Sequence, residues 1–179
     1  MHQLGLNQAA DYLEMAGRLV RLKGQPVETF KPPADAQWVL NSDRGLSYSN
    51  TVPEGSRVTS GEWWPTGYSG PPLVSFEEEL AKKLGLAIGD TVTVNVLGRN
   101  VTAKITNLRE IKWENLTINF VLVFSPSTLK AAPYNMLATV SLPHGTSTAS
   151  EAGLLRTLST RFPTFTTLRV RDAIEQRID

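Results

Sequence analysis

The chain has 179 residues, enough for one domain or two small ones with a buried core. Its formal net charge is only +1, which argues against nucleic acid as a partner because phosphate binding needs a clustered basic face. Cysteine is absent and only two histidines occur, His2 and His144, so we expect no disulfide, no metal site and no cofactor.

The first 72 residues predict short elements joined by loops. The segment before Gly17 is typical of a short helix, and the alternation in RLVRLKG, residues 18–24, indicates a strand. QWVL, residues 37–40, is typical of another short strand. The stretch over residues 43–72 is rich in Gly, Pro and Ser and is predicted to be a long irregular loop, of a kind that often carries function.

A helix over Phe76–Leu84 is the clearest prediction of the whole chain. Ser75 and Glu78 match a capping box, and Gly85 stands where a helix commonly ends in a left-handed residue. The three glutamates at 77–79 are interpreted as favourable charges at the helix N-terminus. They do not suit a metal or acid–base site, because successive helix residues point about 100° apart.

The second half of the chain predicts strands and one more helix. TVTVNVL and NVTAKI alternate as a hairpin, with Gly98-Arg99 as a type II′ turn. Further strands are predicted at Thr117–Phe124, in MLATVSL and in FTTLRVR. Thr148 and Glu151 match a second capping box, for a helix that ends before Pro163 and buries Ala152, Leu155, Leu158 and Phe162. A last helix starts at Asp172.

Long apolar segments and targeting signals are missing from this pattern. The longest apolar run, Phe120–Phe124, is far shorter than the roughly 20 residues of a membrane-spanning helix. The first 15 residues lack the basic and apolar regions of a signal peptide. The elements together predict an α+β fold.

Four side chains are candidates for contact with a partner or cargo. GEWWPTGY places Trp63, Trp64 and Tyr68 on a loop, and large aromatic residues are enriched in contact surfaces. The same residues would equally well cover the helix and hairpin that follow. Arg44, in DRG, is either part of a turn with an ion pair or a carboxylate-binding side chain.

No catalytic centre is predicted. The sequence has no G-x-S-x-G elbow and no G-x-x-x-x-G-K-[ST] phosphate-binding loop. His144, in the loop LPHGTS, is either an ordinary surface residue or the base of a serine-dependent hydrolase. Binding, coupling or scaffolding is therefore favoured over catalysis.

One block resembles a known family. LAKKLGLAIGDTVTV, residues 80–94, followed by the hairpin, is similar to the extracytoplasmic domain of FtsX/MacB-type ABC transporter permeases. AQWVLNSDRGLSYS, GEWWP and INFVLVFSP look like the YbbP-like subgroup, which is associated with lysophospholipase/arylesterase systems.

The resemblance implies a fold and a set of partners. A porter-like βαβ part would comprise 1–46 and 133–179, with its N-terminal portion incomplete, and a β-rich sabre-like part with hairpins and one or two short helices would comprise 47–132. The domain would lie on the periplasmic side of the bacterial inner membrane and relay motion driven by a cytoplasmic ABC ATPase. A periplasmic lipase or thioesterase, a hydrophobic cargo and a second copy of the permease are the implied partners.

Two other functions stay open at this point. One is a free-standing lipid esterase or hydrolase that uses His144 and a serine. The other is a soluble carbohydrate- or peptide-binding module that uses Trp63, Trp64 and Tyr68.

Overall fold

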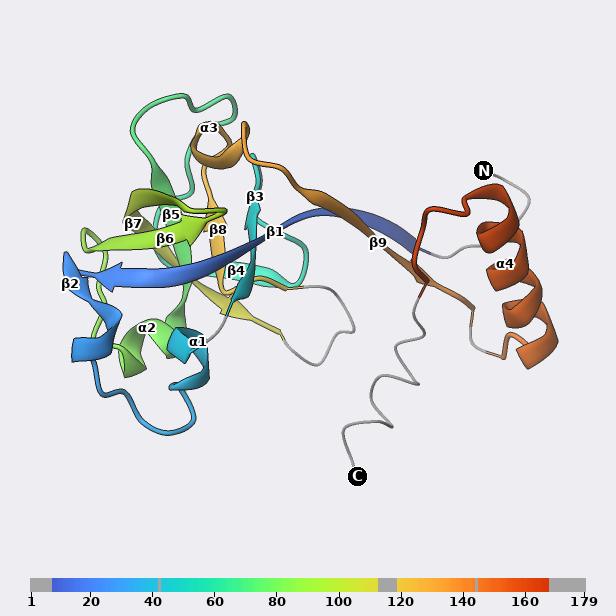
Figure 1. Ribbon diagram of the computed structural model, residues 1–179, viewed down its shortest axis with the longest axis horizontal. Coiled ribbons are helices and arrows are strands. Elements are labelled where there is room, and N and C mark those ends of the chain that lie inside the picture. The colour runs from blue at the N-terminus through green and yellow to red at the C-terminus, as the bar shows by residue number, and fades with distance from the viewer. Residues whose placement is uncertain (1–7, 42, 113–118, 144, 168–179) are drawn as a thin grey trace. The chain divides into compact units, whose positions relative to one another are not determined.

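A computed structural model describes residues 8–41, 43–112, 119–143 and 145–167. Strands dominate the described chain, and its helices are short except for the last one (Figure 1). In chain order the elements are β1 (Gln8–Leu22), β2 (Gln25–Pro26), a 3₁₀ turn (Val27–Thr29), α1 (Trp38–Asn41), β3 (Arg44–Tyr48), β4 (Ser56–Gly61), β5 (Leu73–Glu77), α2 (Glu78–Lys83), β6 (Thr91–Val96), β7 (Arg99–Ile111), β8 (Leu122–Phe124), α3 (Pro126–Leu129), β9 (Asn135–Ser141) and α4 (Thr148–Arg161).

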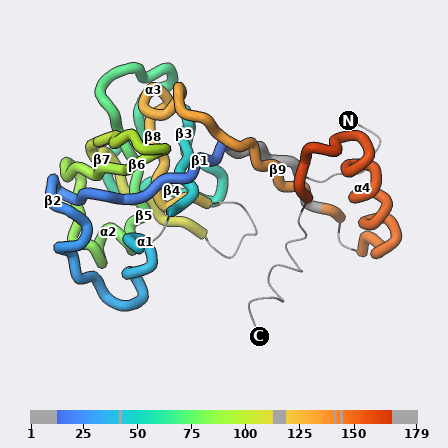
Figure 2. The backbone as a smooth tube through the Cα atoms, in the orientation of Figure 1, coloured from blue at the N-terminus to red at the C-terminus, as the bar shows by residue number. Residues whose placement is uncertain are grey.

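Six of the strands form a closed sheet, in the order β1-β3-β8-β5-β7-β6 and back to β1 (Figure 1, Figure 2). The contacts β3–β8 and β5–β7 are parallel, and the other four contacts of the ring are antiparallel. Strands β2 and β9 pair with β1, and β4 pairs with β7. The ring closes because β6 pairs with both β1 and β7, so each of the six strands has a hydrogen-bonded neighbour on both sides.

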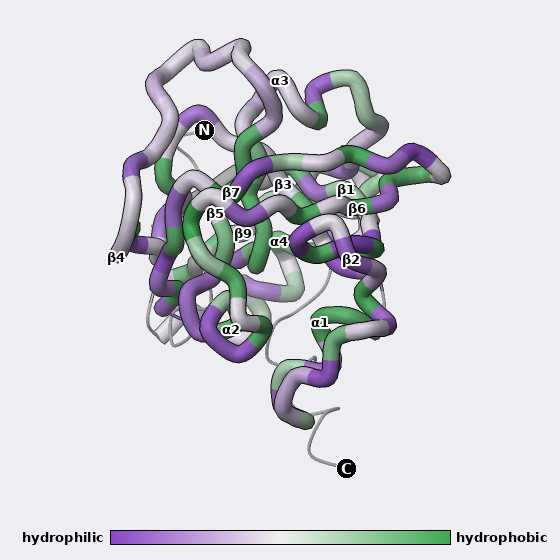
Figure 3. Tube along the Cα trace, turned by 90° about the vertical axis from the view of Figure 1, so that its left-hand side faces the viewer, coloured by the Kyte–Doolittle hydropathy of each residue, from purple (hydrophilic) through white to green (hydrophobic). Residues whose placement is uncertain are grey.

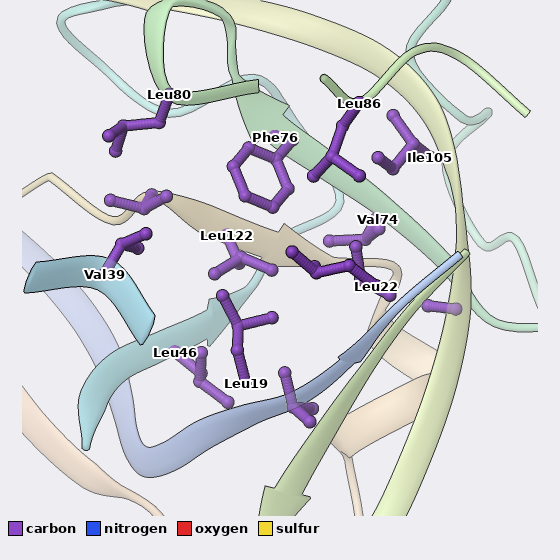
Figure 4. Packing of buried hydrophobic residues seen from close by; sticks show 14 of the residues in the cluster. Leu19, Leu22, Val39, Leu46, Val74, Phe76, Leu80, Leu86, Ile105 and Leu122 are labelled. Carbon is purple, nitrogen blue, oxygen red and sulfur yellow. The ribbon is translucent and has the colours of Figure 1, made fainter. Parts of the chain in front are cut away.

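The interior of the closed sheet is the hydrophobic core. Alternate residues of each strand point inward, as the two-residue period of a strand requires. Figure 4 shows side chains from β1, β3, β5, β7 and β8 pointing toward one another, together with residues of α1 and α2. The fully buried members of this core include Leu19, Leu22, Leu46, Val74, Phe76, Ile105, Leu122 and Phe124.

The helices lie at two sides of this sheet. Figure 1 and Figure 3 place α1 and α2 on one side and α3 on the opposite side. The segment of α2 is largely hydrophilic in Figure 3, and only its Leu80 and Ala81 are buried. Helices α1, α2 and α3 thus close the ends of the core with one or two buried apolar side chains each.

The observed fold agrees with the expected class only in its coarse form. A mixed, sheet-dominated fold with few helices is observed, but the closed sheet does not clearly match a porter-like βαβ unit. By compactness the chain divides into a unit of Asp11–Ala138 and a unit of Met1–Ala10 with Thr139–Asp179. The division into parts at 46/47 and 132/133 stays a prediction.

Three predictions for the N-terminal half are wrong. Residues 8–16 are not helical, because β1 extends from Gln8 to Leu22 and buries Met15 in the core. QWVL contributes to the one-turn helix α1, where Val39 and Leu40 are buried. The predicted long loop contains the strands β3 and β4, which its Gly, Pro and Ser content conceals.

The predicted helix begins two residues too early. Ser75 and Phe76 belong to β5, since Val74 and Phe76 alternate into the core, and the helix α2 covers Glu78–Lys83. Its N-cap is Glu77, whose carboxylate accepts hydrogen bonds from the backbone N–H groups of Glu79 and Leu80 at 3.1 and 2.7 Å. The capping box of Ser75 and Glu78 is therefore wrong.

The end of α2 matches the prediction. Gly85 has a φ of +65°, and its N–H donates to the carbonyl of Lys82. The N–H of Leu86 donates to the carbonyl of Ala81 at 2.8 Å, which completes a Schellman motif, and Leu86 is buried.

The β6–β7 hairpin is confirmed, but its turn is shifted by one residue. Val96 pairs with Arg99, so the two turn residues are Leu97 and Gly98, with φ values of +49° and +84°. Two positive φ values define a type I′ turn, the mirror form that suits the right-handed twist of a hairpin. The predicted type II′ turn at Gly98-Arg99 is wrong.

The C-terminal elements are partly as predicted. Strand β9 covers Asn135–Ser141, and β8 covers only Leu122–Phe124 of the predicted Thr117–Phe124. Helix α4 is capped by Ser147 rather than Thr148, through a bond from the N–H of Ser150 at 3.2 Å. None of its residues is buried, against the predicted stripe. The predicted strand FTTLRVR falls partly, and the last helix wholly, outside the described residues.

The cap of α2 yields a stability prediction. Replacing Glu77 with Ala leaves two backbone donors of a buried helix start without their acceptor, so we expect a loss of about 1–2 kcal/mol in the free energy of unfolding. Urea titration of the variant measures this loss. Glu79→Ala is the matched control, since Glu79 is exposed and should change stability by less than about 0.5 kcal/mol. Equal losses in the two variants would contradict the cap.

Candidate functional site

The loop between β4 and β5 folds over the outer face of the closed sheet. Val123 of β8 and Leu73 of β5 point outward, away from the core, and the aromatic residues of this loop cover them. Trp64 is 4% exposed and packs with Phe120 and Val123, and Trp63 and Tyr68 lie half-buried at the margin of this cluster. We call residues Glu62–Pro72 the aromatic loop.

The polar groups of the aromatic loop are used to hold it in place. The indole N–H of Trp64 donates to the carbonyl of Ser49 at 2.8 Å, and that of Trp63 donates to the carbonyl of Asn50 at 3.0 Å. The hydroxyl of Tyr68 donates to the carbonyl of Pro71 at 2.9 Å. What Trp63 and Tyr68 still offer to solvent is therefore mainly ring surface, which is suited to apolar or stacking contact.

The structure brings together three of the four residues that the sequence predicts as contact residues. Trp63, Trp64 and Tyr68 form one group, and the Trp63 and Trp64 rings lie 4.1 Å apart between centroids. Arg44 has a different neighbour, since its guanidinium stacks at 4.5 Å over the ring of Trp38 and donates to the carbonyl of that residue. Contact of any of these four residues with a partner or cargo stays a prediction.

Beneath the aromatic loop lies a buried cation that the sequence analysis missed. Arg109 of β7 is completely buried. Its guanidinium donates to the hydroxyls of Ser75 and Ser56, at 2.7 and 2.9 Å, and to the carbonyls of Phe120 and Val121, at 2.8 and 3.3 Å. Arg109 thus connects β4, β5 and β7 to the segment that leads into β8.

The charge of Arg109 is maintained at neutral pH in spite of its burial. Loss of hydration lowers the pKa of Arg109 to about 10, and the nearby carboxylate of Glu77 opposes this shift. Glu77 and Arg109 are paired residues of the parallel strands β5 and β7. The same carboxylate that caps α2 therefore also supplies negative potential to the buried cation.

Arg109 was missed because its burial depends on strand register. In NLREI, residues 107–111, the sequence alone favours a solvent-facing position for Arg109 on a strand, because arginine is usually exposed. Only the pairing of β7 with β4 and β5 places the small Ser56 and Ser75 next to it. Two serines on separate strands are not a signal that a single sequence reveals.

The arrangement offers little acid–base or metal chemistry. Among the described residues no three His, Cys, Asp or Glu side chains group as metal ligands. The three consecutive glutamates have separate roles: Glu77 caps α2, Glu79 is exposed, and Glu78 pairs with Lys82 at 3.0 Å, a hydrogen bond that lowers the pKa of Glu78. His144 lies outside the described residues, so its role as a base stays a prediction.

None of the helices in the described ranges is both long enough and apolar enough to cross a bilayer.

The chain is similar to one curated protein along most of its length. It is 32% identical over 165 residues to the uncharacterized ABC transporter permease YbbP of Escherichia coli (strain K12), which covers 92% of this chain but 19% of that protein. The chain therefore spans about a fifth of that relative's length. No protein-family profile matches the chain.

Among solved structures, the chain is similar to a domain of a proposed permease protein from Porphyromonas gingivalis. The TM-score is 0.42 at 17% identity, and the match covers 89% of this chain and 72% of that domain.

Arg109 yields a second stability prediction. Arg109→Ala would leave two carbonyls and the hydroxyl of Ser75 buried without their donor, and the half-buried hydroxyl of Ser56 would lose its donor too, so we expect a loss of about 3 kcal/mol or more in the free energy of unfolding. Because that variant risks not folding, Ser56→Ala tests the same network by removing one acceptor, at a cost of about 1–3 kcal/mol. Chemical denaturation measures both.

Arg57→Ala is the matched control for this network. Arg57 is the next residue of β4, and its side chain is 72% exposed and pairs with the exposed Glu110 at 2.8 Å. An exposed pair contributes about 0–1 kcal/mol. A Ser56→Ala variant as stable as the wild-type protein would contradict the role of Arg109 as the link between the strands.

Proposed function

We propose that the chain is the extracytoplasmic domain of an FtsX/MacB-type ABC transporter permease of the YbbP-like subgroup. The observation that carries this proposal is the 32% identity to a permease over 92% of the chain. Because the chain matches 19% of that relative, the proposal assigns the membrane-spanning segments to the rest of a longer protein. The domain would then lie on the periplasmic side of the bacterial inner membrane.

The proposed role of the domain is mechanical rather than catalytic. The sequence has no G-x-x-x-x-G-K-[ST] motif, so ATP hydrolysis is assigned to a separate cytoplasmic ATPase. A closed sheet with paired strands and a close-packed core deforms little under load. Such a body passes on a displacement of the membrane segments to whatever binds its surface.

The aromatic loop is the proposed contact surface. The indole N–H of Trp63 and the hydroxyl of Tyr68 are already bonded within the protein, which keeps these half-buried rings in a fixed position. A rigid aromatic surface binds with a small loss of conformational entropy. The proposed partner is a periplasmic lipase or thioesterase, or else a hydrophobic, lipid-like cargo, and Arg44 stacked on Trp38 is a second, polar contact point.

Membrane fractionation of the source cells tests this proposal. An antibody against the chain should detect a membrane band much larger than the 19.7 kDa of this chain. In spheroplasts, protease added from outside should remove the antibody's epitope while a cytoplasmic marker protein stays intact. A water-soluble band of about the chain's own mass would contradict the proposal and favour the free-standing hydrolase or the ligand-binding module.

A further inference from the structure

The tip of the β6–β7 hairpin carries a residue that its backbone disfavours. Leu97 has a φ of +49° and is 70% exposed. In a type I′ turn this position is usually Asn, Asp or Gly, because other side chains crowd the backbone at positive φ. An exposed leucine at such a position is not stabilised by burial in the folded chain. The turn is therefore more strained than it would be with Asn, Asp or Gly at this position.

A second turn of this protein provides an internal comparison. Lys23 and Gly24 join β1 to β2, with φ values of +51° and +74°, so this turn has the same pattern of two positive φ values. Its first residue is a lysine that pairs with Asp90 at 3.4 Å, as suits a solvated turn. The same turn conformation therefore has a charged residue, Lys23, in one turn and an exposed apolar residue, Leu97, in the other.

The tip that presents Leu97 is stiff. The side-chain carbonyl of Asn95 accepts a hydrogen bond from the N–H of Gly98 at 3.1 Å, and its amide donates to the side chain of Asn100 at 2.7 Å. These bonds hold both strands together directly below the turn. A turn whose backbone is already ordered loses little conformational freedom on binding, which favours affinity.

The charged side chain next to Leu97 in the hairpin is basic. From Thr91 to Arg109 the sequence contains no Asp or Glu. Arg99, next to the turn, is exposed. On the neighbouring strand, Arg18 lies opposite Asn95 in the register of β1 and β6, but its guanidinium pairs with Asp43 at 3.2 Å and adds no net charge. An apolar point with a basic margin is complementary to an apolar pocket with an acidic margin.

We propose that Leu97 is an anchor that inserts into an apolar pocket with an acidic rim on a partner protein. The membrane surface is the weaker candidate. Full burial of one leucine contributes about 10- to 100-fold to a binding constant, whereas stable membrane attachment needs two stronger signals. In a protein pocket the same leucine adds specificity to other contacts. This inference uses only the hairpin and does not depend on the chain's being part of a permease.

Site-specific photocrosslinking in the natural full-length protein, in its own cells, tests the inference. Benzoylphenylalanine replaces Leu97 in one strain and Lys23, at the matched turn, in another. We expect an ultraviolet-dependent adduct with one other protein from position 97 and not from position 23. Arg99→Glu in the same chain should abolish that adduct, because it reverses the charge beside the anchor.

The protein identified in the adduct is then the probe in a binding measurement. We expect Leu97→Asn to weaken its binding at least tenfold and, because Asn suits the turn, to raise the thermal midpoint of the variant by about 2–4 °C. Lys23→Asn should leave binding unchanged. A loss of binding together with a gain in stability separates contact from misfolding.

Four results would overturn the inference. They are an adduct with lipid only, an adduct only with another copy of this protein, no adduct at position 97, or unchanged binding of the Leu97→Asn variant. Membrane fractionation is independent of all four, so the failure of one proposal is distinguishable from the failure of the other.

Discussion

Closure of the sheet by β6 is the constraint on which the rest of the structure depends. Because β6 pairs with both β1 and β7, the six strands enclose a space that only inward-facing side chains can fill. Inward positions must therefore be apolar, whereas outward positions are not needed for the core and can form other contacts. On β5 and β8 the outward positions hold the aromatic loop and the Arg109 network, which together form a second layer outside the core.

The second layer is held by a charge rather than by apolar packing alone. Burying a guanidinium costs several kcal/mol of hydration, and Arg109 recovers this through four hydrogen bonds and the potential of Glu77. A leucine in its place would pack but would hold neither the carbonyl of Phe120 nor the hydroxyls of two strands. Since the ring of Phe120 packs against Trp64, the position of the aromatic loop follows from the position of this cation.

Local signals in the sequence were reliable where the structure is locally determined. Gly85 and Leu86 end α2 as predicted, because a Schellman motif is built from residues within one turn. Ser75 failed as a cap because the inward alternation of Val74 and Phe76 keeps it in a strand, and its hydroxyl binds Arg109 instead. The burial of Arg109 and the closure of the sheet both depend on which strands pair. That pairing is determined by residues that are distant from one another in the sequence. The hairpin was predictable, but the identity of its turn residues required the register of Val96 and Arg99.

Stiffness and recognition impose different demands on the same surface. A body that transmits displacement gains from bonded loops and satisfied polar groups. Recognition needs apolar side chains left accessible, which costs solubility or strain. In the proposed role, the half-buried rings of Trp63 and Tyr68 would meet this need at little cost because their polar tips are bonded. Leu97 meets it at the cost of a strained turn, and an unrelieved cost of this kind at an exposed position is the clearer sign of a contact.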